Sequence, residues 1–442
     1  MIKKTALFLS LWLCQTWALS CSDPIIIAEA KSIIAPLSTV LNEKGDVMVI
    51  WRDNIDNPHE PLKYIERDTE SGWSVPSIIP WSGGEISLQR VFMDIEGNVF
   101  LGGKLEKAPA KKTFLQFIKK EKNRSWSDVV DVVRPEDNFK TAFAGAFDPQ
   151  GNILYAGIRD EDPFDYEKDD SLWMFQYQHQ SANKISRPIY SSSKFLSVDE
   201  LVVNKLGDRF FVSTHFNSSS SSYKELAGLW IKDGKTKENL FPICKLRKKW
   251  LYFHLRGSMN SQKNAALIWV RKADSVCFIE AILSVNGKWQ EPIELFGSTD
   301  TLSTRSKPNI LIDEQGNVVA LWVMNEKKGC VIYGAYKLVG EPWSLPKAIS
   351  SPTKYNHRLV LKKSGGKFVV VWDEVDTKGG AEVHGAILET STQKGSTAIL
   401  SPPGQKSYFP SFDVNEKGLG VVSWVTEKEG KSQIQIAELN LN

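Results

Sequence analysis

The chain contains 442 residues, of which 42% are hydrophobic and 24% are charged, with 55 basic and 52 acidic side chains and a net charge of +3. This composition is typical of a folded protein and excludes a disordered chain. Lys3 and Lys4 lie in the N-terminal segment, and without them the net charge falls to about +1, which excludes nucleic acid as a partner.

Residues 1–20 have the pattern of a secretory signal peptide. Lys3 and Lys4 precede an apolar stretch at 6–13, and small residues follow it before Cys21; the segment is too short to anchor in a bilayer. We expect an exported protein, located in the periplasm, at the outer membrane or outside the cell, with a single domain at 21–442.

Residues 17–21 also fit a relaxed bacterial lipobox, in which Cys21 would be diacylated and become the N-terminus. Ala18 stands where such boxes usually carry Leu, so lipidation and plain release both stay open. A lipid on Cys21 is the one route by which we expect membrane contact, because no later segment is apolar enough to span a bilayer.

The next segment, residues 22–27, resembles the last strand of a repeat, as at 344–349. The final repeat has room for three strands but not four. We therefore predict that the N-terminal strand completes the last blade and closes the ring, which removes exposed sheet edges.

An eight-fold repeat fills the remainder of the chain. Six copies have an Asp/Asn-x-x-Gly turn, and two are degenerate: 260–263 ends in Lys instead of Gly, and 363–366 begins with Lys instead of Asp or Asn. An apolar run ends six residues after each turn, and the copies follow one another at intervals of 50 to 56 residues. The last turn residues are Gly45, Gly97, Gly151, Gly207, Lys263, Gly316, Gly366 and Gly418. Such periods predict an all-β, eight-bladed β-propeller of four-stranded antiparallel blades, here a monomer.

The sixth repeat shows the strand pattern most clearly, at 308–312, 318–323, 330–337 and 343–349. In its turn, Asp313 can accept a hydrogen bond from the backbone two residues on, and Gly316 supplies a positive φ. A cation site at each turn is the alternative, but Asn replaces Asp freely between copies, which favours the structural interpretation.

Tryptophans recur at two places in the repeat. One series stands six residues after the turn, where packing between blades is expected; it comprises Trp51, Trp269, Trp322, Trp372 and Trp424. The other series opens the outermost strand and comprises Trp73, Trp126, Trp289 and Trp343. Cys244, Cys277 and Cys330 are predicted to be small buried side chains, with a Cys244–Cys277 disulfide as the alternative.

Candidate ligand-binding residues gather at the face opposite to the turns. They follow the second strands or stand in loops before the first strands, and comprise Arg52, Asp53, Arg159, Asp160, His215, Arg271, Arg305, His357, Arg358, Asp373, Glu374 and Tyr408. Polar groups at the mouth of a β-architecture are where a ligand is expected, although strand-end loops are also polar because they face water.

Signatures of catalysis and of metal or cofactor binding are missing from the sequence. The six histidines lie at no metal-like spacing, and the acidic run at 159–170 lacks the spacing of a calcium loop. We expect no cofactor and no metal. If the protein is an enzyme, Asp53 with Asp373 or Glu374 is the carboxylate pair that a glycoside hydrolase or lyase would need.

The pattern of 313–322 and 343–346 resembles the repeats of uncharacterised exported bacterial β-propeller proteins, which implies fold and export but no common activity. The chain has a distant similarity to sialidase-like propellers, although its Trp falls two residues late, and to quinoprotein-like propellers, one of which scaffolds barrel assembly at the outer membrane. The leading hypothesis is a non-catalytic envelope propeller that binds a protein or glycan; the rivals are the exported glycosidase or lyase and a purely structural interaction protein.

Overall fold

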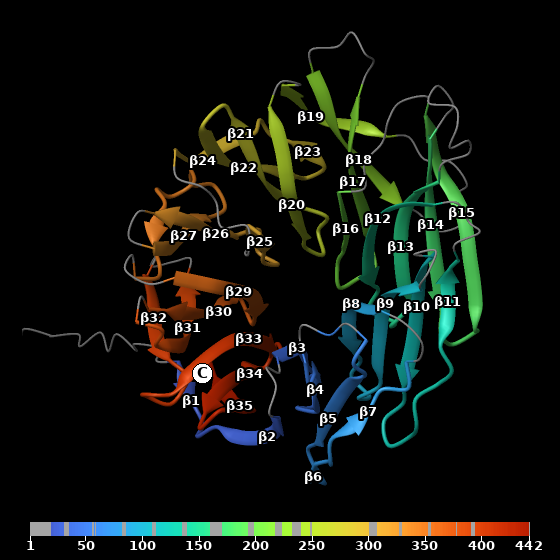
Figure 1. Ribbon diagram of the computed structural model, residues 1–442. Helices are drawn as coiled ribbons and strands as arrows, with labels where there is room; N and C mark the ends of the chain where they lie inside the picture. The colour runs from blue at the N-terminus through green and yellow to red at the C-terminus, as the bar shows by residue number, and fades with distance from the viewer. Residues whose placement is uncertain are drawn as a thin grey trace, which may run out of the picture.

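The computed structural model describes residues 19–30, 35–54, 57, 59–81, 85–107, 112–134, 139–159, 170–192, 199–216, 223–231, 240–247, 250–299, 307–326, 329–351, 355–376, 378–389 and 394–441. In these ranges the chain forms eight small antiparallel sheets, each with at least four strands and no helix. Figure 1 shows the sheets arranged around a central axis, so the predicted eight-bladed propeller is confirmed.

The first four blades follow one another from the N-terminal half of the chain. Blade 1 comprises β3 (Ala35–Leu41), β4 (Val47–Arg52), β5 (Leu62–Asp68), β6 (Gly72–Trp73) and β7 (Ser77–Ile78). Blade 2 comprises β8 (Glu85–Met93), β9 (Val99–Lys107), β10 (Lys112–Lys120) and β11 (Val130–Val133). Blade 3 comprises β12 (Phe139–Phe147), β13 (Ile153–Arg159), β14 (Asp170–Gln178) and β15 (Asn183–Ser192). Blade 4 comprises β16 (Glu200–Val203), β17 (Arg209–Phe216), β18 (Tyr223–Ile231) and β19 (Phe241–Arg247).

The other four blades complete the ring. Blade 5 comprises β20 (Leu251–Met259), β21 (Ala265–Ala273), β22 (Val276–Val285), β23 (Lys288–Trp289) and β24 (Ile293–Ser298). Blade 6 comprises β25 (Asn309–Ile312), β26 (Val318–Glu326), β27 (Gly329–Lys337) and β28 (Lys347–Ala348). Blade 7 comprises β29 (Tyr355–Ser364), β30 (Lys367–Val375), β31 (Ala381–Glu389) and β32 (Lys394–Ile399). Blade 8 comprises β33 (Lys406–Val414), β34 (Leu419–Lys428) and β35 (Lys431–Asn440), joined by β1 (Ser20–Cys21) and β2 (Ile25–Ala30).

The N-terminal strand closes the ring as predicted. Both β1 and β2 pair with β35, and Ile27 of β2 is buried against Val421 and Ile434 of the last blade. The innermost strands β3 and β33 contact each other, so blade 8 adjoins blade 1. Because β1 and β2 pair with β35, the N-terminal segment supplies the outermost strand that blade 8 would otherwise lack.

The Asx turns fold as the sequence indicated. In the first turn the Lys44 N–H donates to Asn42 Oδ1 (3.0 Å), and Gly45 has a φ of 96°. The Asn42 amide also donates to the Ile95 carbonyl of the next blade's turn (3.4 Å), and Asn415 donates in the same way to the Asn42 carbonyl (3.2 Å). The turn side chains therefore join neighbouring blades as well as closing their own hairpins.

Tryptophans of the first series fill the spaces between blades, as predicted. Trp51, Trp269, Trp322, Trp372 and Trp424 are among the largest fully buried side chains. Trp424 packs with residues of blades 7 and 8, whereas Trp51 packs with residues of blades 8 and 1. In blade 2 the equivalent position is Gly103, where a Cβ atom would lie 2.5 Å from the ring of Trp81. A different tryptophan thus occupies that space.

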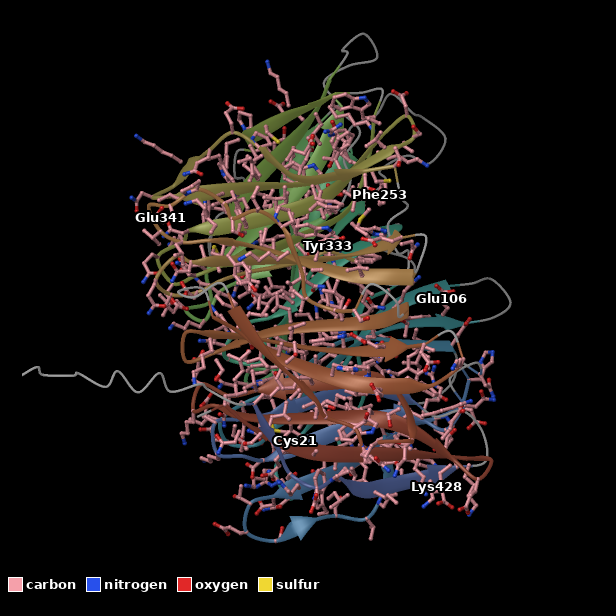
Figure 2. All side chains as sticks on the ribbon, turned by 90° about the vertical axis from the view of Figure 1, so that its left-hand side faces the viewer. Cys21, Glu106, Phe253, Tyr333, Glu341 and Lys428 are labelled. Atoms are coloured by element: carbon pink, nitrogen blue, oxygen red, sulfur yellow. The ribbon has the colours of Figure 1, made fainter. Side chains whose placement is uncertain are left out.

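The innermost strands are irregular near one end. In six blades the pairing of the innermost strand with its neighbour contains a β-bulge or register shift, and β16 and β25 begin at about the same place in their blades. Figure 2 places Glu106, Phe253 and Lys428 at this face and Glu341 at the opposite one. Bulges redirect side chains, and they are common beside functional sites.

Candidate functional site

Several of the candidate ligand-binding residues hold the strand ends together. The Trp51 indole donates to Asp53 (3.0 Å), whose other oxygen pairs with Lys63. In blade 7 the Trp372 indole donates to Glu374 (2.9 Å). These carboxylates stand two residues after an interface tryptophan, so satisfying a buried indole N–H explains their position.

Two of the three predicted arginines near the ends of second strands, Arg52 and Arg271, are also engaged. Arg52 is buried and donates to the carbonyl oxygens of Glu60 (3.1 Å) and Ile86 (2.8 Å), which joins blade 1 to blade 2. Arg271 is buried between the rings of Trp250 and Phe278, and it pairs with Glu280 and Glu294. Blade 5 contains both of these carboxylates, so Arg271 stabilises its own sheet.

Asp373 lies in the interior between blades 7 and 8. Its side chain is 0% exposed; Oδ1 accepts the N–H of Arg358 (2.7 Å) and Oδ2 accepts the N–H of Phe409 (2.9 Å). Both donors stand in the bulges of innermost strands. With Asp373 and Glu374 both buried, neither carboxylate of this blade is open to a glycan, and the pairing of Asp53 with them provides no accessible acid pair.

Three residues expected in loops lie instead within innermost strands. His357 and Arg358 belong to β29 and Tyr408 to β33, because the bulges let these strands continue further than the apolar pattern indicates. The Tyr408 hydroxyl donates to Glu427, and burial together with this carboxylate raises its pKa. Burial lowers the pKa of Arg358, with Asp373 opposing the shift.

The remaining predicted residues are only partly covered by the structure. The Arg159 guanidinium lies 4.9 Å from the centre of the Trp173 ring. His215 lies near the C-terminal end of β17, where it pairs with Glu225 of β18. For His215 and His357 the structure describes the backbone only. Asp160 and Arg305 lie outside the described residues, as does most of the acidic run that follows Arg159.

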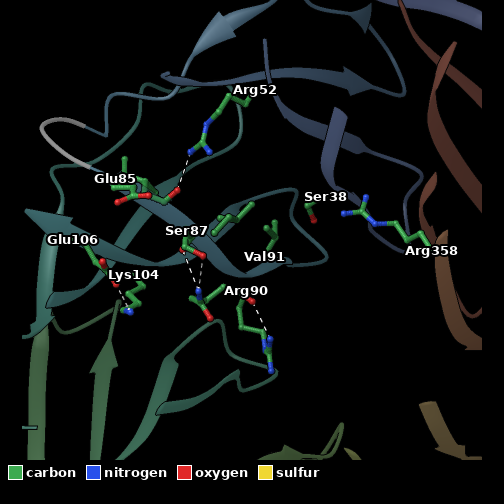
Figure 3. A pocket seen from close by; sticks show the side chains of 12 residues that line it. Ser38, Arg52, Glu85, Ser87, Arg90, Val91, Lys104, Glu106 and Arg358 are labelled. Carbon is green, nitrogen blue, oxygen red and sulfur yellow. Dashed lines mark hydrogen bonds and ion pairs between the residues drawn. The ribbon is translucent and has the colours of Figure 1, made fainter. Parts of the chain in front are cut away.

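A cavity of about 660 Å³ opens between the innermost strands of blades 1, 2 and 7. Its lining includes Arg52 and Arg358, which the sequence predicted, and Figure 3 shows Arg358 entering from the side opposite to the wall formed by β8. Arg90, Lys104, Glu85 and Glu106 complete the charged part of the wall. Four cations thus face two carboxylates in the described lining.

Arg90 also lines a second cavity of about 450 Å³, bounded by the innermost strands of blades 2 to 7 and by Glu416 in the turn of blade 8. From β8 it donates to the Gly145 carbonyl of blade 3 (2.8 Å) and approaches Glu200 of blade 4 (4.0 Å). Glu200 is 8% exposed in its side chain and accepts a bond from Arg256 of blade 5 (2.9 Å). One carboxylate is therefore shared by arginines from two other blades.

Lys307, just before β25, completes what we call the Glu200 cluster: Arg90, Glu200, Arg256 and Lys307. Among the described residues Lys307 has no ion pair. Lys307 is largely exposed; partial burial lowers its pKa, Arg256 and Arg90 lower it further, and Glu200 opposes the shift. Burial and the same kind of repulsion, from Lys307 and Arg256, lower the pKa of His254. The cluster holds three cations and one carboxylate, so positive charge is left uncompensated.

The Glu200 cluster was missed in the sequence, although a signal for it exists. Arg90, Glu200 and Arg256 each stand seven residues before the last turn residue of their repeat. At the same place the other repeats carry Ser38, Ala144, Asn309, Leu359 and Ser411. Aligning the repeats on this position shows charge in three copies and none in the others.

Further features of the described residues limit the chemistry. Cys244, Cys277 and Cys330 are free thiols, and burial raises the pKa of Cys244 to about 12. In the ranges that the structure describes, no three His, Cys, Asp or Glu side chains gather as a metal site would require. Those ranges also contain no helix long and apolar enough to cross a membrane.

No protein-family model and no curated protein sequence matches the chain. Among solved structures it is similar to the polysaccharide lyase Uly1, with a TM-score of 0.52, 9% identity, and coverage of 92% of this chain and 90% of that one. A protein of unknown function from Dyadobacter fermentans DSM 18053 gives a TM-score of 0.44 at 10% identity, covering 96% and 100%. An α-L-arabinanase from Penicillium chrysogenum gives 0.41 at 12% identity, covering 68% and 92%. At such identities the likeness concerns the propeller fold.

Proposed function

We propose that the protein is an exported propeller that binds an acidic glycan at the channel, without catalysis. The observation that carries the proposal is the Glu200 cluster, in which arginines from blades 2 and 5 approach one buried carboxylate and the nearby Lys307 adds a third positive charge. Uncompensated charge in a partly buried site attracts an anion more strongly than the same charge on an open surface.

The shape of the site favours a glycan over a protein partner. A cavity of about 660 Å³ falls within the range of about 300 to 1,000 Å³ that small ligands occupy, whereas a protein interface usually buries about 800 Å² on each partner. Arg90 lines this cavity and also belongs to the Glu200 cluster, so the cavity and the excess charge are continuous. Carboxylate or sulfate groups on the sugar would supply the negative charge.

The test is a binding measurement on the mature protein with uronate-containing and sulfated oligosaccharides beside neutral ones. We expect acidic sugars to bind, and Lys307→Ala to weaken binding about tenfold, since about 1.4 kcal/mol corresponds to that factor. Lys307→Arg keeps the charge and should restore most of the affinity. Lys44→Ala, on an exposed turn at the opposite face, is the matched control.

Two outcomes would contradict the proposal. Equal binding of neutral and acidic sugars would show that charge does not select the ligand. An acidic sugar that Lys307→Ala binds as well as the unaltered protein does would place the site elsewhere. Binding should also weaken as salt rises, because salt screens partly exposed charges.

One observation favours an enzyme as the second candidate. Glu85 and Glu106 stand directly opposite each other on β8 and β9, and both line the cavity of about 660 Å³, where Lys104 pairs with Glu106. Like charges at such positions are destabilising, and cross-strand neighbours are close enough for the two carboxyl groups of a glycosidase. Shortening of an acidic oligosaccharide by the protein, abolished in Glu106→Gln, would establish this function in place of simple binding.

A further inference from the structure

Leu19, Ser20 and Cys21 form part of the folded last blade. Ser20 pairs with Asn440 and Cys21 with Leu439 in the ladder between β1 and β35. The ladder continues at Ser22, whose N–H donates to the Glu438 carbonyl (2.9 Å) and whose hydroxyl accepts the Glu438 N–H (3.0 Å). The two residues that precede Cys21 are therefore held by the fold.

Leu19 fills a defined space between blades 7 and 8. Its side chain is 7% exposed and belongs to the apolar cluster that contains Val383, Leu400 and Leu439. A Cβ atom on Gly385 would lie 2.8 Å from the Leu19 side chain, so the absence of a side chain at Gly385 makes room for it. Removing Leu19 would leave an apolar cavity at this interface.

The Cys21 side chain is half-buried in the fold. It packs at the border of the same apolar cluster, with Sγ 3.8 Å from the Leu400 carbonyl oxygen. Burial, reinforced by Asp23, raises the pKa of the thiol to about 11. Lipobox processing would cut the chain between Ser20 and Cys21, remove Leu19, and attach a diacylglycerol to this half-buried sulfur.

We propose that the N-terminal segment is removed by hydrolysis of the Ala18–Leu19 peptide bond, so that the mature chain begins at Leu19 with an unmodified Cys21. The bond follows Thr16 and Ala18, which are small residues at the third and first positions before it, as a signal peptidase requires. Water is the other reactant, and the products are the Ala18 carboxylate and the Leu19 amine. The mature protein is then released without a lipid anchor.

The test is to express the full chain in a bacterium that has both signal peptidase and lipoprotein-modifying enzymes, and to measure the intact mass and the N-terminal peptide. A peptide that begins at Leu19, with an unmodified Cys21, is the expected result. A peptide that begins at a lipid-modified Cys21, or at any other residue, would overturn the proposal. Cys21→Ser should leave the N-terminus and the cell fraction unchanged, whereas a lipoprotein would lose its membrane attachment.

A stability measurement gives a second, independent readout. Leu19→Ala should lower the melting temperature of the secreted protein by roughly 2 to 5 °C, because it empties the space between Gly385 and Leu400. The exposed Ser20 provides the control, and Ser20→Ala should melt with the unaltered protein. If Leu19→Ala also melts with it, Leu19 does not belong to the mature fold and the proposed N-terminus is wrong. Neither result depends on whether the channel binds a glycan.

Discussion

Replacing Asp373 should destabilise the junction of blades 7 and 8. Its two oxygens accept the N–H groups of Arg358 and Phe409, and its side chain is fully buried. Asp373→Ala would leave both donors without this acceptor, and a buried polar group that loses its partner costs about 1 to 3 kcal/mol. The expected loss of unfolding free energy is therefore about 2 to 6 kcal/mol.

Thermal denaturation followed by circular dichroism would measure this loss. For a chain of this size the entropy of unfolding is about 0.9 kcal/mol per degree, so Asp373→Ala should melt roughly 2 to 7 °C lower. The melting temperature of Asp373→Asn should lie between those of Asp373→Ala and the unaltered protein. Its amide retains one acceptor oxygen but turns a donor toward the other N–H. Asp128→Ala changes an exposed carboxylate and is the control. If Asp373→Ala melts with Asp128→Ala, the carboxylate does not hold the bulges together.

Three other perturbations test the closure of the ring, its turns and its interfaces. Deleting residues 22–30 removes β2 from β35, so the protein should melt several degrees lower and aggregate, as size-exclusion chromatography would detect; an unchanged melting temperature would refute closure by this strand. Burial raises the pKa of Glu314, but hydrogen bonds from Ser261 and nearby lysines outweigh this effect. They lower the pKa to about 2, below an unfolded value of about 4.3. This carboxylate therefore stabilises the fold above about pH 4.3, and the contribution is lost as the pH falls toward 2. In Glu314→Gln the loss of unfolding free energy between pH 4.3 and pH 2 should be smaller by about 1 kcal/mol. An unchanged dependence of stability on pH in this range would contradict the assignment. Gly103→Ala places a methyl group against Trp81 and should cost about 1 to 3 kcal/mol in urea unfolding, whereas a neutral result would show that Trp81 moves freely.

The sequence contained enough to predict the ring, because each blade repeats the same local physics. A positive φ closes every first hairpin, an Asx side chain supports seven of the eight, and an apolar run makes every second strand. Lys263 shows how far this holds: it replaces glycine in the fifth turn and still adopts a φ of 63°. Closure by residues 22–27 followed from the same pattern, since the last repeat was one strand short.

The site was harder to predict because its residues depend on contacts between blades. In the sequence Asp373 has the features of a ligand-binding residue. Its hydrogen-bond partners lie 15 and 36 residues away, in bulges that the alternation of apolar and polar residues does not reveal. Arg90 and Glu200 are each unremarkable within their own repeat. Only the curvature of the ring brings Arg90 within 4.0 Å of Glu200, two blades further on.

A repeated architecture separates structural positions from functional ones. Positions that carry the same kind of residue in most blades, such as the interface tryptophans of five blades, meet packing needs that recur around the ring. A ligand does not share the symmetry of the ring. Its contacts should therefore lie at a position of the repeat that faces the axis and carries different residues in different blades. The register of Arg90, Glu200 and Arg256 is such a position, being charged in blades 2, 4 and 5 and uncharged in the other five. Arg90 connects this charged register with the cavity between blades 1, 2 and 7, so an acidic ligand should bind off the axis, beside blade 2.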